Sequence, residues 1–591
     1  MLTGKTFVDP LEMPFSRRGS YLCFANKNGG SNEYGKAQLW LSTARLRAGD
    51  RNSGSLMHGN NFRQLQLEII KDGLPRQCVI STTPYELKLE CLFGSVSFCI
   101  GDVKYAKCKS TDGLTLRISP AAGAGMLGGP AAFNLLDGSW KMNFSNYFMI
   151  FVPTTGKIQE GPMGSIELVP DANGVIEMAM EESLVDPKRR ASYLTYEEGV
   201  AAVKADFDDY VKRVAPSFPP KYEKRGMHAL WTLWGLTVMP DGETVYKHPM
   251  VKMNRSSFEA AFSWQQGMQA MFLSHDLRLA WEILLSCFDK QDRTGRIADS
   301  LAYNGSGETM KPPIQGVALL WLMEHRDISG MPKAEMEHLW DGMEKWTKFH
   351  LEYRDLDHDG IFENHSPVET GWEDGSYFRV GFPLASPDMN AFLALQEEAL
   401  AKLGRLIGKS ADVCSYWEAK SKDTVKKIIE MFWTNDGWTA VNVVTKARSK
   451  STGMPLYCAL LLGKRLPQAI IDRSIEIIYS KPGFDTPFGL ASEMLDSPYF
   501  RHGWCSGSIG TPIQALMAIA FENCGRPDLA RSLAKKYLDT MINHGLYHIH
   551  DTYTGEMEYR HGGMKFFGEE AFFNSGWTSG NYVFFAEHYG D

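Results

Sequence analysis

The chain has no run of about 18 apolar residues, no cluster of Lys and Arg, and no CxxC cysteine pair. Without a long apolar run, no membrane-spanning helix is expected. Without a basic cluster, and with a net charge of -8, no nucleic-acid partner is expected, because phosphate binding needs a basic surface. These absences therefore predict that neither a membrane nor a nucleic acid is a partner.

The ten cysteines stand singly, and several lie inside apolar patterns. Isolated cysteines of this kind are typical of reduced core residues and do not form the regular framework of a disulfide-rich protein. Residues 1–10 lack the uninterrupted apolar segment of a secretory signal. Together these features predict a cytoplasmic protein.

The short motifs that bind nucleotides or catalytic zinc are also absent from the sequence. It contains no Walker loop, no dinucleotide-type glycine motif after a strand, no HExxH and no GxSxG. His544, His548, His550 and His561 are close in sequence, but their spacing is not typical of a zinc site. We therefore predict no cofactor and no catalytic metal.

Two kinds of hydrophobic pattern divide the 591 residues. From about residue 15 to 185, short stretches such as Tyr85–Phe93 alternate between apolar and polar residues and are separated by Gly, Asn and Pro. This period of two predicts an antiparallel β-sandwich, which we assign to residues 1–190. Helical spacing then begins near residue 196 and ends at a group of prolines, which predicts a helical linker over residues 191–225.

Residues 226–591 show almost only helical periodicity, and the predicted helices number close to twelve. Consecutive helices joined by loops must bury their apolar faces on one another, and a closed double ring does so while leaving one end as a funnel. An open solenoid or separate bundles are alternatives, although no repeat of about 34 or 40 residues is found. The sequence thus predicts a mainly α protein with an (α/α)6 barrel. The predicted helices lie near 256–272, 277–289, 313–325, 333–352, 388–407, 412–432, 468–479, 508–523, 527–543 and 575–588.

Seven acidic residues fall within the 20 positions from Asp355 to Asp374. The first of them, in Asp355-Leu-Asp357-His-Asp359-Gly, resemble the start of an EF-hand calcium loop. The twelfth position, however, is Ser366, where an EF-hand has a bidentate Glu. Asp and Gly in this order also form ordinary turns, so the sequence leaves calcium binding open.

The second half of this acidic stretch is the first candidate for catalysis. Glu369, Glu373 and Asp374 surround Trp372 and two glycines in a loop that no helical period explains. An indole can pack against the apolar face of a pyranose, and a neighbouring carboxylic acid can protonate the leaving oxygen. We predict Asp374 or Glu373 as this acid. A solvated acidic loop that caps the next helix is the alternative.

A second group of carboxylates, which includes Glu556, Glu569 and Glu570, lies near the C-terminus. Inverting glycoside hydrolysis needs a base about 6.5 to 9.5 Å from the acid, and a barrel can bring two distant loops together. We predict Glu570 or Glu569 as the base. Alternatively, these two residues only cap the last helix, where negative charge is favourable.

In this order, the segments resemble the trehalase-like and processing-glucosidase-like (α/α)6 glycoside hydrolases, especially family 63 and its mannosylglycerate hydrolase-like enzymes. The likeness spans about residues 195–590. Glu369-Thr-Gly-Trp-Glu373 is similar to the family's E-S-G-W-D segment, whose Asp is the acid, and Tyr499-Phe-Arg501 with Trp504 is similar to its Y-W-R-G-x-x-W loop. The resemblance implies an exo-acting, inverting hydrolase of a small oligosaccharide or glycoside.

The chain departs from the family pattern at two positions. His548 stands where the family has its base Glu, and Gln265 stands where it usually has an Asp. Either the base lies elsewhere, at Glu569, Glu570 or Glu556, or the chemistry differs. The alternatives are a lyase in which a His or Tyr takes the proton, and a sugar-binding protein without turnover.

The residues predicted to bind the carbohydrate substrate come from loop-to-helix junctions. These junctions combine aromatic side chains or prolines with groups that hydrogen-bond hydroxyls. The 15 Trp and 23 Tyr of the chain also favour sugar binding. The predicted binding residues are Trp264, Gln265, Gln315, Glu369, Trp372, Arg501, Trp504, His548 and Trp577.

Overall fold

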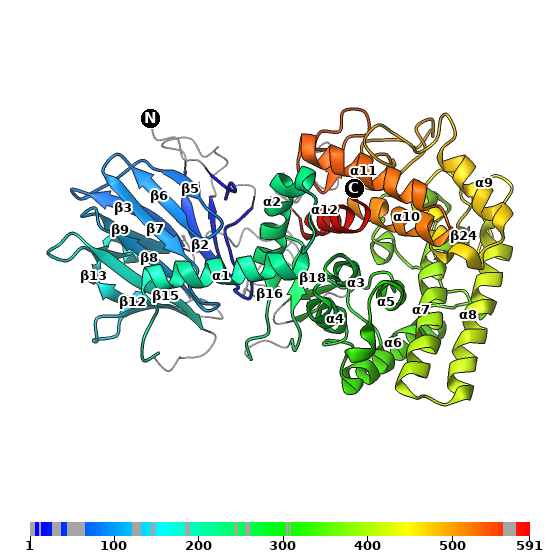
Figure 1. The fold of residues 1–591 in the computed structure, drawn as a ribbon, viewed down its shortest axis with the longest axis horizontal. Helices are drawn as coiled ribbons and strands as arrows, with labels where there is room; N and C mark the ends of the chain where they lie inside the picture. The colour runs from blue at the N-terminus through cyan, green and yellow to red at the C-terminus, as the bar shows by residue number, and fades with distance from the viewer. Residues whose placement is uncertain are drawn as a thin grey trace.

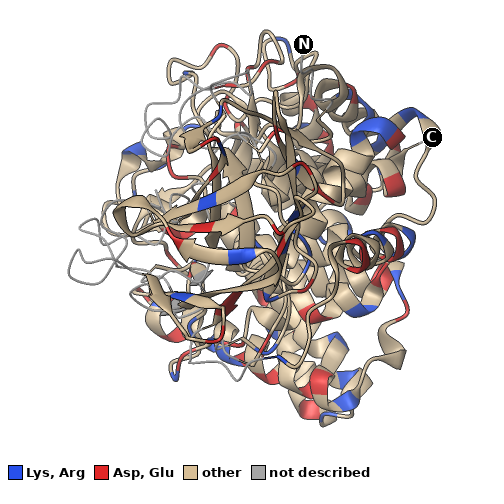
Figure 2. Cartoon of the chain, turned by 90° about the vertical axis from the view of Figure 1, so that its left-hand side faces the viewer, with Lys and Arg blue, Asp and Glu red and all other residues tan. Residues whose placement is uncertain are grey.

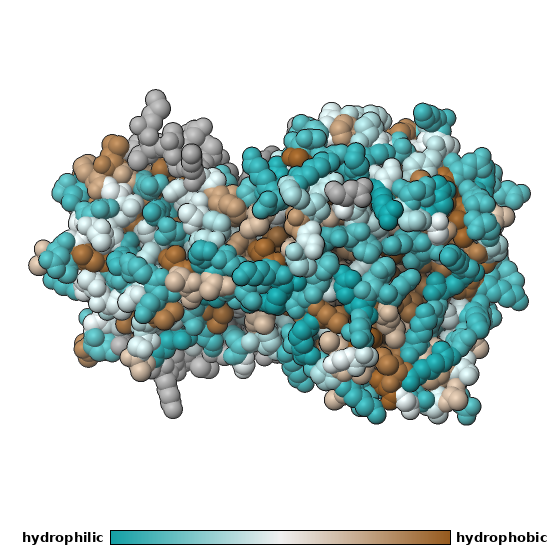
Figure 3. Space-filling view, in the orientation of Figure 1, coloured by the Kyte–Doolittle hydropathy of each residue, from teal (hydrophilic) through white to brown (hydrophobic). Residues whose placement is uncertain are grey.

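The computed structural model shows an elongated molecule with a β-rich part and a helical part (Figure 1). Both signs of charge are interspersed over the β-rich end (Figure 2), and hydrophilic residues cover most of the helical part on the face shown in Figure 3. None of the described helices is long and apolar enough to cross a bilayer. The structure describes residues 6–10, 13–26, 37–43, 65–120, 132–143, 148–183, 190–242, 246–254, 261–302, 305–306, 309–558 and 575–590.

The N-terminal part consists of two antiparallel sheets, as the alternating pattern predicts. One has the order β1-β2-β3-β9-β14-β13, with β4 on β3, and the other the order β10-β11-β12-β15-β8-β7-β6-β5. In β6, Leu87, Leu89 and Cys91 are buried whereas the residues between them are partly exposed. The strands are β1 (Leu22–Asn26), β2 (Leu39–Thr43), β3 (Leu65–Lys71), β4 (Leu74–Pro75), β5 (Val79–Thr82), β6 (Leu87–Cys91), β7 (Gly94–Cys99), β8 (Tyr105–Ser110), β9 (Thr115–Pro120), β10 (Ala132–Asn134), β11 (Trp140–Asn143), β12 (Phe148–Thr155), β13 (Lys157–Glu160), β14 (Ile166–Val169) and β15 (Ile176–Ser183).

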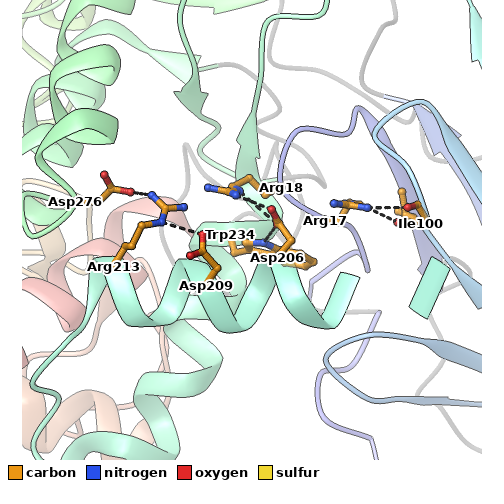
Figure 4. Close-up of polar contacts among 9 residues, drawn as sticks. Arg17, Arg18, Ile100, Asp206, Asp209, Arg213, Trp234 and Asp276 are labelled. Atoms are coloured by element: carbon orange, nitrogen blue, oxygen red, sulfur yellow. Dashed lines mark hydrogen bonds and ion pairs between the residues drawn. The ribbon is translucent and has the colours of Figure 1, made fainter. Parts of the chain in front are cut away.

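Helix α1 (Tyr196–Val214) joins the two parts. It begins with a capping box, in which Thr195 and Glu198 each satisfy the other's backbone amide. Figure 4 shows the polar contacts along it: Asp206 accepts hydrogen bonds from Arg18 and from Trp234 Nε1, the latter at 2.6 Å, and Arg213 pairs with Asp276 at the start of the next part. These contacts tie α1 to the N-terminal segment and to the helical part.

The helical part is a double ring. Each inner helix contacts the next, in the closed order α3, α5, α7, η6, α10, α12 and back to α3. The outer helices α2, α4, α6, α8, α9 and α11 pack on this ring. The inner helices are α3 (Ser263–Phe272), α5 (Gln315–His325), α7 (Pro387–Ile407), η6 (Met454–Arg465), α10 (Thr511–Asn523) and α12 (Gly576–Tyr589); the outer ones are α2 (Pro220–Leu236), α4 (Leu277–Ser286), α6 (Lys333–Tyr353), α8 (Ala411–Phe432), α9 (Gln468–Ile478) and α11 (Pro527–His544).

Side-chain patterning explains which helices are inner and which are outer. Helix α3 is buried on every side, whereas α6 buries one stripe and exposes the other. A helix that is apolar all round must be surrounded by protein, and an amphipathic one covers it. Because inner and outer helices alternate along the chain, the loops that lead into the inner helices gather at one end of the barrel. That end carries the candidate site.

Most of the predicted helices are present, with three differences. The helix expected over 256–272 begins at Ser263, after a short strand, and residues 255–260 lie outside the described part. Helix α2, which starts at Pro220 inside the expected linker, was not predicted. The prolines there indicate the end of a helix, but proline is also well suited to the first turn of a new one. The sequence also did not predict η6, a short apolar run that ends near Gly463.

The loops of the barrel contain only short elements. The 3₁₀ turns are η2 (Pro162–Gly164, in the β-rich part), η3 (Ile328–Gly330), η4 (Pro367–Thr370) and η5 (Ser376–Val380). The short strands are β16 (Thr237–Val238), β17 (Met250–Val251), β18 (Ala261–Phe262), β19 (Ser300–Ala302), β20 (Gly305–Ser306), β21 (Leu384–Ala385), β22 (Trp433–Thr434), β23 (Gly437–Trp438), β24 (Val441–Asn442), β25 (Ile509–Gly510) and β26 (Ile549–His550).

Candidate active site

The acidic loop before α7 is fixed by a tight turn. In this turn the Thr370 hydroxyl donates to Pro367 O at 2.7 Å and accepts from the Trp372 amide at 3.0 Å. Gly371 follows with a φ of 73°, and a Cβ on it would lie 2.7 Å from the Trp264 ring. Only glycine combines this backbone angle with such a close approach. The turn sets the direction in which Glu373 and Asp374 leave the loop.

Three of the predicted sugar-binding indoles form a buried cluster beneath this turn. Trp264 meets Trp372 edge to face, with ring centroids 5.2 Å apart, and meets Trp577 at 4.8 Å. The Trp372 indole donates to Asp388 Oδ2 at 3.0 Å, and burial raises the pKa of Asp388 to about 6. All three rings are buried, so they support the floor of the site and present little surface to a ligand.

Asp374 is held by the loop that precedes α10. Its Oδ1 accepts from the Cys505 amide at 2.6 Å, and its Oδ2 accepts from the Ser506 hydroxyl at 2.8 Å. Arg501 Nη2 lies 3.8 Å from the same Oδ2, and the side chains of Asp374 and Arg501 are 13% and 58% exposed. A carboxyl group at the mouth of the barrel therefore has two defined donors and a solvent-facing cation beside it.

Glu373 has a different environment. Its Oε1 lies 2.7 Å from Lys311 Nζ, which also donates to Val368 O at 2.6 Å. Burial alone would lower the pKa of Lys311, but the carboxylates of Asp299 and Glu373 raise it on balance. The Glu373 side chain is 41% exposed, whereas Lys311 is buried. The resulting ion pair joins the start of α5 to the acidic loop.

Trp504 and His548 stack on one another at the side of the site, with ring centroids 4.7 Å apart and planes 15° apart. The Trp504 indole donates to Gly371 O at 2.9 Å, which joins the two loops a second time. Burial, with a smaller effect of His550, lowers the pKa of His548 to about 3. A neutral imidazole with so low a pKa is a weak proton acceptor.

A second group of titratable residues centres on His502, which lies in the loop that holds Asp374 through Cys505 and Ser506. His502 Nδ1 is 2.8 Å from Glu558 Oε2 and 3.2 Å from Asp551 Oδ2. Both carboxylates are buried, while the His502 side chain is 34% exposed. Burial would raise the pKa of Asp551, but the backbone amides of Tyr553 and Thr554 lower it on balance. Two buried acids thus orient one accessible imidazole.

His502, Asp551 and Tyr553 lie in segments that the sequence pointed to, but they were not among the predicted catalytic or binding residues. Asp551 lies beside β26, and the Glu558 amide donates to Ile549 O at 3.2 Å, so Glu558 sits across a hairpin from the predicted base position. Tyr553 is 60% exposed, and the centroid of its ring lies 6.4 Å from the centroid of the His502 ring. The run His548 to Gly555 was the signal that could have pointed to this hairpin.

The other predicted residues have different surroundings. Gln265 and Gln315 are buried, and Gln265 Nε2 donates to Lys252 O at 3.5 Å. Glu369 forms an ion pair with Arg354 at 2.9 Å. Glu569 and Glu570, the predicted bases, lie outside the described residues. Glu556 pairs with His544 at 3.2 Å and its side chain is mostly exposed.

Comparison with known proteins agrees with this architecture. A sequence profile of the mannosylglycerate hydrolase MGH1-like glycoside hydrolase domain matches residues 259–573, more than half of the chain. A search of curated proteins found no match.

Three solved structures are similar to this chain to different degrees. The GH63 mannosylglycerate hydrolase from Thermus thermophilus, in complex with glucose, has a TM-score of 0.52 and 14% identity, over 61% of this chain and 99% of that one. An uncharacterized conserved protein from the same organism has a TM-score of 0.51 and 16% identity, over 60% and 98%. Neutral trehalase Nth1 from Saccharomyces cerevisiae has a TM-score of 0.46 and 15% identity, over 57% and 73%. At such identities, the two Thermus structures indicate a shared (α/α)6 barrel fold and nothing finer.

Proposed function

Because the chain belongs to the mannosylglycerate hydrolase MGH1-like glycoside hydrolase family, we propose that it is an exo-acting enzyme that hydrolyses a small oligosaccharide or glycoside with inversion. The observation that supports this most is the placement of Asp374. Its carboxyl group is held at the barrel mouth by Cys505 and Ser506, which lie in the same loop as His502, and the two buried acids that contact His502 lie in the hairpin of β26. An acid and a proton acceptor thus share one end of the barrel, as glycoside hydrolysis by an acid and a base requires.

We propose Asp374, and not Glu373, as the general acid. A general acid must carry a proton in the resting enzyme. The Lys311 ammonium group has donors only, so the Glu373 oxygen that faces it accepts, and this carboxylate is engaged with a buried cation at 2.7 Å. The cation beside Asp374 is Arg501, which is mostly exposed and 3.8 Å away, and the Ser506 hydroxyl that donates to Asp374 can also accept, so it can face either the carboxylate or the carboxylic acid.

We propose His502 as the group that takes the proton from water, with Asp551 and Glu558 as positioning residues. In this scheme a water oxygen attacks the anomeric carbon as the glycosidic bond breaks. The leaving oxygen takes the proton of Asp374, and the proton of the water passes to His502. The buried carboxylates then stabilise the imidazolium, as in other acid-histidine pairs. Before the next turnover His502 releases its proton to solvent, and Asp374 takes up a proton from solvent.

Exposed groups around the mouth are proposed to bind the sugar and its substituent. Tyr553 can stack on a pyranose ring, and Trp504, at the side of the site, contributes part of its edge. Arg501 donates to Ser506 Oγ through Nε at 2.9 Å, and most of its side chain faces solvent. A cation in this position favours a substrate with a carboxylate or another anionic group.

No observation in the described part favours the lyase or the binding-protein alternative. The lyase alternative with His548 as its base is disfavoured, because the low pKa of that buried imidazole makes it a poor proton acceptor. A cytoplasmic setting remains a proposal. It is consistent with the ten cysteines, all of which are buried.

The experiment that tests this function is turnover on a panel of disaccharides and of glycosides with neutral and acidic aglycones, followed by NMR of the released sugar. We expect hydrolysis of at least one compound and loss of about a hundredfold or more in kcat in His502→Ala. In Glu558→Gln the expected loss is smaller, with a shifted pH profile. If His502→Ala keeps full activity, the base lies elsewhere, with Glu569 and Glu570 as the next residues to test.

A further inference from the structure

A loop wrapped around one carboxylate leads from α6 to the acidic loop. Asp355 Oδ1 accepts from the Asp359 amide at 3.1 Å, and Asp355 Oδ2 accepts from the Gly360 amide at 2.9 Å. Gly360 has a φ of 85°, a conformation that favours glycine. The carboxylates of Asp355, Asp357 and Asp359 alternate along this loop, and glycine comes sixth, which is the order found in oxygen-rich calcium loops.

Three carboxylates converge at the centre of the loop. Single oxygens of Asp355, Asp357 and Glu363 all lie within 4.8 Å of one another. Calcium binds oxygens at about 2.3 to 2.6 Å, so ligands on opposite sides of the ion are about 5 Å apart. The spacing of these oxygens therefore matches one shared cation.

Glu363 gives an independent indication of a ligand. Its side chain is fully buried, and Oε2 accepts from the Leu356 amide at 3.0 Å, but Oε1 has no hydrogen-bond partner. A buried carboxylate oxygen without a partner is costly, and the neighbouring Asp residues add repulsion. Burial, then the charges of Asp357, Asp355 and Asp359, raises the pKa of Glu363 to about 7.

We propose that Asp355, Asp357 and Glu363 form a calcium site, with Asp359 as a further acidic neighbour. Glu363, eight residues after Asp355, supplies the carboxylate that an EF-hand takes from its twelfth position, where this chain has Ser366. An all-oxygen set with several negative charges selects calcium or magnesium over zinc, which prefers nitrogen and sulfur. Calcium is favoured because a loop of carboxylates suits its larger radius and variable geometry.

The nearby lysines do not replace such an ion. Lys446 Nζ lies 3.1 Å from Asp357 Oδ2, and the Lys446 side chain is mostly exposed. Lys427 lies near Gly360 but pairs with Asp423 at 2.8 Å. Among the ion pairs of the described residues, none involves Asp355 or Glu363. Asp355 and Glu363 thus have no direct ion-pair partner in the described part, and the ammonium groups of Lys420 and Lys427 lie near Gly360 instead.

A calcium ion bound here would stabilise the acidic loop of the candidate active site. Arg354, the residue before the loop, pairs with Glu369 at 2.9 Å, and the His365 amide donates to the other Glu369 oxygen at 2.7 Å. Glu369 lies in the turn that leads to Asp374. A bound calcium is therefore expected to order the base of the acidic loop, whatever substrate the enzyme uses.

The test uses the full chain, first stripped with EDTA and then titrated with CaCl2 by calorimetry, with thermal unfolding measured in parallel. We expect one calcium per chain. At a calcium concentration about a hundred times Kd, Tm should rise by about 2 to 4 °C. MgCl2 at the same concentration should give a smaller shift.

Glu363→Gln is the decisive variant, because the amide keeps the shape and removes one buried charge. It should lose at least tenfold in calcium affinity while its Tm in EDTA equals or exceeds that of the wild type. Glu337→Gln, at an exposed pair on α6, is the matched control and should bind calcium normally. Absence of stoichiometric binding by the wild type at 1 mM calcium, roughly the weak limit of extracellular sites, or an unchanged affinity in Glu363→Gln, would overturn the proposal.

Discussion

Replacing Asp374 by Asn tests the assignment of the general acid. The amide can still accept from the Cys505 N–H and can donate to Ser506 Oγ, so the loop should keep its conformation. The change removes a charge-assisted hydrogen bond, which we expect to cost about 1 kcal/mol of unfolding free energy. The chemistry should suffer far more. Loss of a general acid lowers kcat by about 10² to 10⁴, or roughly 2.7 to 5.4 kcal/mol of transition-state stabilisation.

Glu373→Gln is the matched comparison, because it removes the neighbouring carboxylate. Here the buried Lys311 ammonium loses one of its two neighbouring carboxylates and keeps Asp299, which we expect to destabilise the fold by about 2 kcal/mol. The catalytic effect should be less than tenfold if Glu373 does not protonate the leaving group. The two variants thus predict opposite rankings: Asp374→Asn is the less active, and Glu373→Gln is the less stable.

The assay combines steady-state kinetics on two substrates with thermal unfolding of each variant. A natural glycoside needs protonation of its leaving oxygen, whereas a glycosyl fluoride does not. The defect of Asp374→Asn should therefore shrink by at least tenfold on the fluoride. An equal defect on both substrates, or a larger loss in Glu373→Gln, would refute the assignment.

Three further predictions concern the surroundings of the site. Gly371→Ala places a Cβ 2.7 Å from Trp264 at a positive φ, so Tm should fall and tryptophan fluorescence should change; an unaltered melting curve would contradict the packing described. Tyr553→Ala should raise KM with little change in kcat or Tm, because this exposed ring contributes binding only; a loss confined to kcat would argue against stacking. Burial raises the pKa of Glu397 from 4.5 to about 7, so the folded state binds more protons than the unfolded state between these values, and stability falls as pH rises through this window. Glu397→Gln should therefore increase the free energy of unfolding at pH 8 by on the order of 3 kcal/mol and raise Tm, but it should change stability little at pH 4. Thermal melts at several pH values can check this.

Local periodicity was enough to predict the fold. The alternation in Leu87–Cys91 and the helical spacing in α6 and α8 follow from which faces are buried. Each of these segments shows its buried face in its own order of apolar and polar residues. Helix α2 and η6 were not predicted, because prolines and continuous apolar runs do not by themselves distinguish a helix from a loop or a strand. In both, the surrounding ring decides the conformation.

The site was predictable only in part, because its chemistry depends on contacts between distant segments. The loop with Asp374 could be found from residue types, whereas the pairing of Lys311 with Glu373 spans 62 positions and that of His502 with Glu558 spans 56. No local pattern encodes such pairs. Residue type also does not reveal the orientation of a side chain. Trp372 was expected to contact the sugar, but its indole is buried and donates to Asp388.

The most direct test of the proposed inverting hydrolysis is proton NMR of the sugar released in the first minutes of wild-type turnover. The proposal predicts that the anomer opposite to that of the substrate appears first and then equilibrates, with a water oxygen at the anomeric carbon. Initial release of the retained anomer, formation of an unsaturated sugar, or tight binding without turnover across the panel would contradict it.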